Sequence, residues 1–252
     1  MSPTAIGGVV FACVFAGALA GMALGSVLPD HHLSKESLDV VKLGMGLVAT
    51  MAALVLGLLV AAAKSSFELQ ETQLKQAAAQ TLLLDRVLAQ YGPETSAARE
   101  LIRRVIVRRL EETWPEDDSR PASLNSDTMP LMESAQKEIR ALSPQNDAQR
   151  WLQSRALQVS GNAVETRWLL FVGHGSSIQG LFLVVVVFWI TMIFASFGLS
   201  APRNGTVVAV LFVSALSVAG ALFLVLEMDN PYEGLIKLPS VPYRYTLAHL
   251  GQ

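Results

Sequence analysis

Charged residues are scarce in this chain. Only 16% of its 252 residues are charged, whereas soluble domains have about 25%. The net charge of −2 gives no general attraction to nucleic acid or anionic lipid. The single cysteine excludes an internal disulfide framework, and because Cys13 lies in an apolar run, we expect a small buried hydrophobic residue there. We find no metal-ligand spacing, phosphate-binding loop or activated nucleophile, and therefore predict neither an enzyme nor a bound metal or cofactor.

Apolar residues, by contrast, make up 52% of the chain and gather in four uncharged runs, at 2–29, 43–63, 175–202 and 204–226. A bilayer core is crossed by about 20 apolar residues in a helix. Since backbone groups in lipid must be satisfied within the segment, each run predicts a transmembrane helix. The fold class is therefore an all-α membrane protein with four transmembrane helices and a helical cytoplasmic domain inserted between the second and third.

The inserted segment, 64–174, is helical by pattern. Nothing between Ala63 and Tyr91 breaks a helix, so the second transmembrane helix is predicted to continue to Tyr91 and to end at Gly92-Pro93. A short helix is expected at 131–142. The next helix is predicted to begin with Ser143 as its N-cap.

Residues 94–114 predict a helix with one apolar face, made of Ala98, Leu101, Ile102, Val105, Ile106 and Leu110. Five arginines spread over its remaining surface: Arg99, Arg103, Arg104, Arg108 and Arg109. They could line an ion path or touch lipid head groups. We favour the simpler interpretation, a solvated face with salt bridges.

The basic residues predict the orientation. Most of the 19 Lys and Arg lie in the inserted segment, which the positive-inside rule places in the cytoplasm together with both termini. The predicted organisation is then 1–63 (transmembrane helices one and two), 64–174 (cytoplasmic helices), 175–227 (transmembrane helices three and four) and 228–252 (a cytoplasmic clasp and tail).

Several stretches carry a family resemblance. They are LGMGLVATMAALVLGLLVAAAKSSF (43–67), LLLDRVLAQYGPE (82–94), VVFWITMIFASFGLSAPRN (186–204) and LEMDNPYEGLIKLPS (226–240). They resemble the bestrophin-like family of bacterial membrane proteins, and the layout of helices is more distantly similar to that of bestrophin ion channels. The resemblance implies a homo-oligomer, a pentamer, in the bacterial inner membrane (the plasma membrane).

The second helix of bestrophins lines the pore and forms a narrow apolar neck. By position, the resemblance implies that Thr50, Leu54 and Leu58 face the axis here, with Thr and Leu but no aromatic residue in the neck. Beside them runs a stripe of small residues that would let helices pack closely: Gly46, Ala49, Ala53 and Gly57. Such a stripe also occurs in any tightly packed bundle.

A distinctive turn follows the fourth run. Pro231 would end the helix, Gly234 would allow the chain to reverse, and LIKL would dock on the cytoplasmic helices. A similar turn joins the membrane and cytoplasmic parts of bestrophins, which implies a clasp formed by Glu227, Asp229, Pro231, Tyr232, Glu233 and Gly234. Calcium-gated bestrophins bind Ca²⁺ in this region. Three acids are few for a cation that takes six to eight oxygens, so we expect a structural clasp.

Passive ion conduction through a helix-two pore, with an apolar constriction that gates by dewetting, is the function that these features imply. Its partners would be the lipid bilayer, further copies of the chain and inorganic ions, with no nucleic acid. The alternative is a non-conducting membrane scaffold or regulator that binds partners through its cytoplasmic helices. A coupled transporter is disfavoured because the four runs contain no intramembrane charge.

Overall fold

The computed structural model describes residues 2–29, 34–115, 128–172, 180–229, 231–232 and 234–251. Throughout these ranges the regular structure is helical, without a strand. In chain order the elements are α1 (Pro3–Val27), α2 (Lys35–Tyr91), the short 3₁₀ helix η2 (Pro93–Thr95), α3 (Ser96–Thr113), α4 (Met129–Ala141), α5 (Asp147–Val172), α6 (Gly180–Ser200), α7 (Gly205–Asp229) and α8 (Val241–His249).

Four of these helices, α1, α2, α6 and α7, are long and apolar enough to cross a membrane. They overlap the four uncharged runs, so the prediction of an all-helical, multi-pass membrane protein is confirmed. The first turns of α1 and α7 are capped by polar side chains. The side chain of Ser2 accepts a hydrogen bond from the backbone N–H of Ala5, and that of Asn204 accepts one from Val207.

The longest helix is α2, whose 57 residues span roughly 85 Å at 1.5 Å per residue. Its predicted continuation to Tyr91 is confirmed, because no proline interrupts the segment. Gly92 follows with a φ of 138°, a conformation that side chains disfavour. The hydroxyl of Thr95 then donates a hydrogen bond to the Leu88 carbonyl at 2.7 Å, which satisfies a carbonyl in the last turn of the helix.

By its internal contacts the chain divides into two compact units. The first unit comprises Met1–Phe67 and Ser176–Asn230, and the second comprises Glu68–Gly175 and Pro231–Gln252. The membrane-crossing parts of α1, α6 and α7 belong to the first unit together with the N-terminal half of α2. The C-terminal half of α2, with α3, α4, α5 and α8, belongs to the second.

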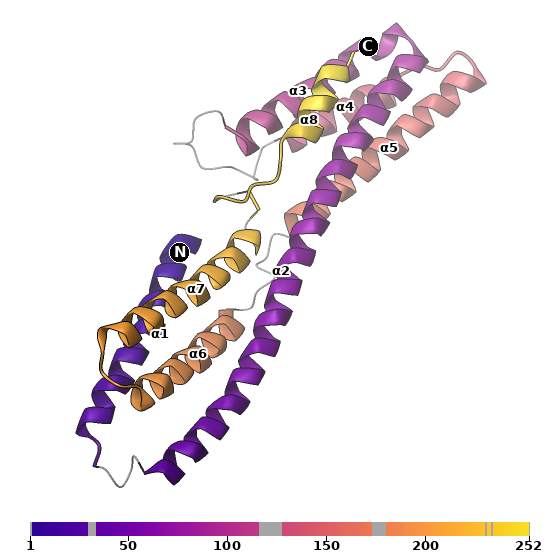
Figure 1. The fold of residues 1–252 in the computed structure, drawn as a ribbon. Helices are drawn as coiled ribbons and strands as arrows, with labels where there is room; N and C mark the ends of the chain where they lie inside the picture. Colours follow the sequence, from indigo (N-terminus) through magenta and orange to yellow (C-terminus); the bar gives the residue numbers. More distant parts are fainter. Residues whose placement is uncertain are drawn as a thin grey trace. The chain divides into compact units, whose positions relative to one another are not determined.

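In the first unit, α1 lies against both α6 and α7 (Figure 1). Their shared core is largely aliphatic and includes Val14, Val186 and Leu222. The prediction that Cys13 is buried is wrong, because its side chain is exposed on α1. In a membrane span the outer face is as apolar as the core, so an apolar run does not predict which residues the protein itself covers.

In the second unit, α3 packs against α4 and α8, and α4 packs against α5 (Figure 1). The predicted apolar face of α3 points inward: four of its members are buried, Ala98, Ile102, Val105 and Ile106. On α5 the buried side chains are small ones such as Ala156 and Ser160, whereas Trp151 and Trp168 are exposed.

The beginning of α5 differs from the prediction. Its cap is Asn146 rather than Ser143, and the helix begins at Asp147. The Asn146 side chain accepts a hydrogen bond from the backbone N–H of Gln149, whose own side chain accepts one from the N–H of Gln145, each at 2.8 Å. This reciprocal pairing resembles a capping box and satisfies two backbone donors, whereas Ser143 could satisfy one.

Candidate functional site

The N-terminal half of α2 has one face covered by the protein and one left open. Leu54 and Leu58 are 71% and 69% exposed, and Thr50 is exposed beside them. The Thr50 hydroxyl donates to the Leu47 carbonyl at 2.7 Å, so it needs no partner outside the helix. Leu59, only 7% exposed, belongs to the core of the first unit. The residues predicted to line a pore therefore share an uncovered face.

The predicted packing stripe beside this face is mostly uncovered by the residues that the structure describes. Gly46, Ala53 and Gly57 are exposed and Ala49 is half-buried. A Cβ added to Gly46 or Gly57 would meet nothing within 4 Å. Close packing by this stripe would therefore have to involve another molecule, and its role stays a prediction.

The closest helix packing in the first unit involves a different stripe, which the sequence reasoning missed. Three glycines follow one another at steps of four residues on α1: Gly17, Gly21 and Gly25. A Cβ on Gly21 would overlap the carbonyl oxygen of Ala195 on α6, and one on Gly198 would overlap that of Ala18 on α1. The signal was present, since small residues four apart let membrane helices approach closely.

The acids predicted for the clasp lie at the end of α7 or just after it. Glu227 and Asp229 are both buried in the last turn of that helix, and Glu233 lies outside the described residues. Among the described residues, no group of three or more His, Cys, Asp or Glu side chains could hold a metal ion. Ca²⁺ takes six to eight oxygen ligands, more than the two described carboxylates supply.

The rest of the turn belongs to the second unit. Pro231 and Tyr232 are buried, and Gly234 has a φ of 101°, in the region that favours glycine. The backbone N–H of Leu238 donates to the Pro231 carbonyl at 2.8 Å, which closes the loop. Trp114 of the segment after α3 donates its indole N–H to the Leu238 carbonyl, also at 2.8 Å. The segment after the turn is thus anchored on the second unit, while its action as a clasp stays a prediction.

Aromatic residues surround one arginine in this region. The guanidinium carbon of Arg109 lies 5.2 Å from the centroid of the Tyr243 ring, a cation–π distance. The ring of Trp114 lies 5.8 Å from that of Tyr243. Burial raises the pKa of Tyr232 to about 12, against the opposing effect of the Arg109 charge. Two of these rings, those of Tyr232 and Tyr243, come from the C-terminal segment, which therefore contributes to the core of the second unit.

A comparison with known families matches most of the chain. A family model described as Bestrophin-like domain matches residues 12–243, nearly the whole chain. The protein belongs to the bestrophin-like family. The family suggested by the sequence stretches is thereby confirmed. No curated protein and no solved structure matches the chain.

The bestrophin-like chain also contains a buried ion pair that sequence reasoning missed. The guanidinium of Arg99 on α3 donates two hydrogen bonds to the carboxylate of Asp85 on α2, at 2.7 and 3.0 Å. The same carboxylate accepts a third from the backbone N–H of Gly251 at 3.2 Å. The hydrogen bond to Asp85 raises the pKa of Arg99, against the lowering effect of burial. No local pattern joins residues so far apart in the chain.

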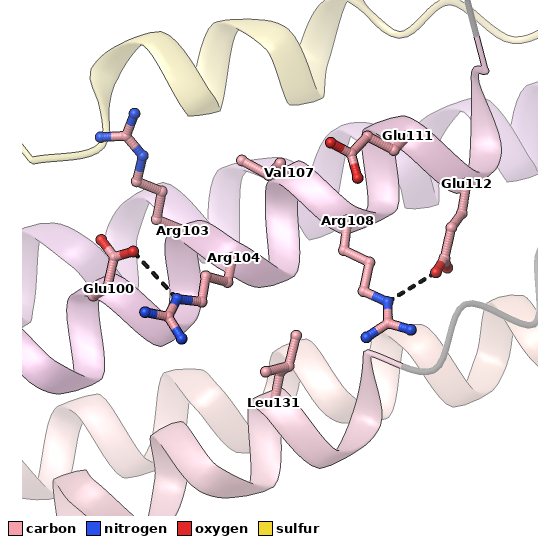
Figure 2. A pocket seen from close by; sticks show the side chains of 8 residues that line it. All are labelled: Glu100, Arg103, Arg104, Val107, Arg108, Glu111, Glu112 and Leu131. Carbon is pink, nitrogen blue, oxygen red and sulfur yellow. Dashed lines mark hydrogen bonds and ion pairs between the residues drawn. The ribbon is translucent and has the colours of Figure 1, made fainter. Parts of the chain in front are cut away.

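The outer side of α3 carries an open groove of about 400 Å³, which Figure 2 shows. Arg108 pairs with Glu112 at 2.9 Å and Arg104 with Glu100 at 3.3 Å, each one helical turn away. Two of the five arginines of this helix therefore form salt bridges along its exposed surface, as predicted, whereas Arg99 pairs with the buried Asp85. The exposed pairs contribute about 0–1 kcal/mol each to stability.

Proposed function

We propose that this bestrophin-like protein is an ion channel rather than an enzyme. In this proposal several copies, five by resemblance to bestrophins, surround an axial pore in the bacterial inner membrane. The pore is lined by α2, with Thr50, Leu54 and Leu58 toward the axis. The inserted helices and both termini lie in the cytoplasm. The lipid bilayer, the other copies and the permeating ions are the partners.

The observation that carries the proposal is the opposite exposure of the two faces of α2. Leu58 is exposed while Leu59, the next residue, is buried in the core. The open face holds large apolar side chains and no charge between 43 and 63. A ring of such side chains gives water few hydrogen-bonding partners, and so forms a constriction that conducts only when it is wetted. Family membership supports the same function.

The small residues beside that face support close approach of neighbouring copies. The open space at Gly46 and Gly57 leaves room for a helix of a second molecule, and backbones come closest where side chains are small. This assembly would bring the α2 helices together around the axis. Crosslinking of the protein in native membranes and its mass in detergent would give the number of copies.

The test is ion flux in liposomes. The wild type, the double variant Leu54→Ala/Leu58→Ala and the control Leu59→Ala are reconstituted separately, and the fluxes of K⁺, Na⁺ and Cl⁻ are compared. We expect the double variant to pass ions several times faster than the wild type, because a wider ring is more easily wetted. Leu59→Ala removes core packing on the other face and should leave the flux unchanged.

The alternative, a non-conducting scaffold, is favoured by the charged groove on α3, whose open form suits a protein partner. A monomer or dimer that passes no ion in any of the three preparations would reject the channel and leave the scaffold.

A further inference from the structure

A small, largely enclosed cavity of about 20 Å³ lies inside the second unit. Its walls come from α2, α3, α4, α5 and α8, and include Thr81, Arg109, Met132, Ala163 and Tyr243. About 10–15 Å³ is sufficient for one water molecule. The cavity therefore has room for one small ligand atom and no more.

Among the residues that the structure describes, two hydrogen-bond donors beside this cavity have no acceptor. The Tyr243 side chain is only 1% exposed, and its hydroxyl has no hydrogen-bond partner. Within the part of the chain that the structure describes, the Arg109 guanidinium makes no ion pair or hydrogen bond; it contacts the face of the Tyr243 ring. The Thr81 hydroxyl is already satisfied, since it donates to the Ala77 carbonyl at 2.9 Å.

The buried hydroxyl of Tyr243 is costly unless something accepts its hydrogen bond, whereas the half-buried Arg109 keeps part of its side chain open to solvent. Buried donors in folded proteins nearly always have a partner, either in the protein or in a bound ligand or water. A guanidinium has five N–H donors and no acceptor, and carries a permanent positive charge. The remaining wall is largely apolar, for example at Met132 and Ala163, so it supplies no compensating negative charge.

We propose that the cavity binds one monatomic anion of about the size of chloride, held by the hydroxyl of Tyr243 and the guanidinium of Arg109. An anion brings only acceptor capacity to a site with an excess of donors, and it compensates the charge of Arg109. A water molecule would satisfy the same hydroxyl but would place no negative charge beside Arg109. The site lies wholly in the second unit and does not rest on the proposed pore.

The binding is tested by thermal unfolding of the full-length protein in detergent. Sodium chloride or sodium bromide is titrated against sodium gluconate at constant ionic strength. We expect the wild-type Tm to rise with halide concentration and to level off, because a ligand that binds the folded state stabilises it. Tyr243→Phe and Arg109→Gln should lose the rise. Arg108→Gln, an exposed position on the same helix, should keep it.

Anomalous diffraction from wild-type crystals grown in bromide tests the position directly and does not depend on whether the variants fold. A peak in the cavity beside Arg109 and Tyr243 is the expected result. Density without anomalous signal, together with a Tm independent of halide, would indicate a bound water and overturn the proposal. A halide effect of equal size in all the variants would place the anion elsewhere and would also overturn it.

Discussion

Arg99 and Asp85 form a bidentate ion pair within the second unit, with N–O distances of 2.7 and 3.0 Å. Asp85 is 1% exposed and also accepts the backbone N–H of Gly251. One carboxylate thus joins α2, α3 and the residues that follow α8. The last residues of the described chain are thereby fixed to the body of the unit.

Removing one partner of this pair should be strongly destabilising. Arg99→Met would leave the Asp85 carboxylate buried without a cation, and we expect the free energy of unfolding to fall by roughly 3–5 kcal/mol. Denaturant unfolding followed by circular dichroism measures the change. The control is Lys75→Met, which removes the exposed Lys75–Glu71 pair and should cost no more than about 1 kcal/mol. Equal effects of the two substitutions would show that the buried pair contributes no more to the free energy of unfolding than the exposed pair does.

The glycine contact between α1 and α6 gives a second prediction. Gly21→Ala places a methyl group where the Ala195 carbonyl oxygen lies, so the two helices must separate. We expect a loss of roughly 1–3 kcal/mol, typical of overpacking, seen as a lower unfolding temperature in detergent. The matched control is Gly8→Ala on the same helix, where an added Cβ meets nothing within 4 Å. An unchanged Gly21→Ala protein would contradict the close approach.

Tyr232 gives a prediction about pH. Its pKa is about 12 in the folded protein and 10.0 ordinarily, because burial disfavours the phenolate. The stability that this shift contributes is complete below pH 10. It is lost as the pH rises from 10 to 12, because the unfolded chain ionises first. Two pH units correspond to about 3 kcal/mol at most.

The measurement is the free energy of unfolding between pH 9 and 12 for the wild type and Tyr232→Phe. The wild type should lose more stability over this interval than the variant. Tyr245→Phe, at an exposed position, controls for the loss of a phenol. Parallel curves for the wild type and Tyr232→Phe would rule out the effect.

The orientation of the chain in the membrane can be tested by chemical labelling of single cysteines. In a Cys13→Ser background, single cysteines are placed at Ser143, between α4 and α5, and at Pro202, between α6 and α7; both positions are exposed. Because the basic residues are concentrated in the inserted segment, Pro202→Cys should react with an impermeant maleimide in intact cells. Ser143→Cys should react only after permeabilisation. The reverse labelling would invert the proposed topology.

The features that the sequence predicted correctly are local ones. Four membrane helices followed from runs of uncharged residues, and the length of α2 followed from the lack of a helix breaker before Gly92. The apolar face of α3 followed from the 3.6-residue period, since each such signal is complete within one segment. Family membership followed from short contiguous stretches of the sequence.

The tertiary structure decided which of several similar patterns meets a partner. Small residues four apart occur on both α1 and α2. Among the described residues, a Cβ on Gly17 or Gly21 of α1 would meet α6, whereas one on Gly46 or Gly57 of α2 would meet nothing within 4 Å. The outcome depends on the rotation of each helix and on what its neighbour presents at that point, and spacing within one segment contains neither. The exposure of Cys13 has the same origin.

The Asp85–Arg99 pair and the cavity beside Tyr243 also depend on tertiary contacts. Tyr243 reaches Arg109 from a segment more than a hundred residues away, and Asp85 reaches Gly251 from still farther. Such contacts form only when the chain has folded back on itself, so no pattern confined to one stretch of sequence predicts them. The sequence by itself determined the helices and the family. Burial and long-range contacts in the folded chain decided which charges and donors lie together in the second unit.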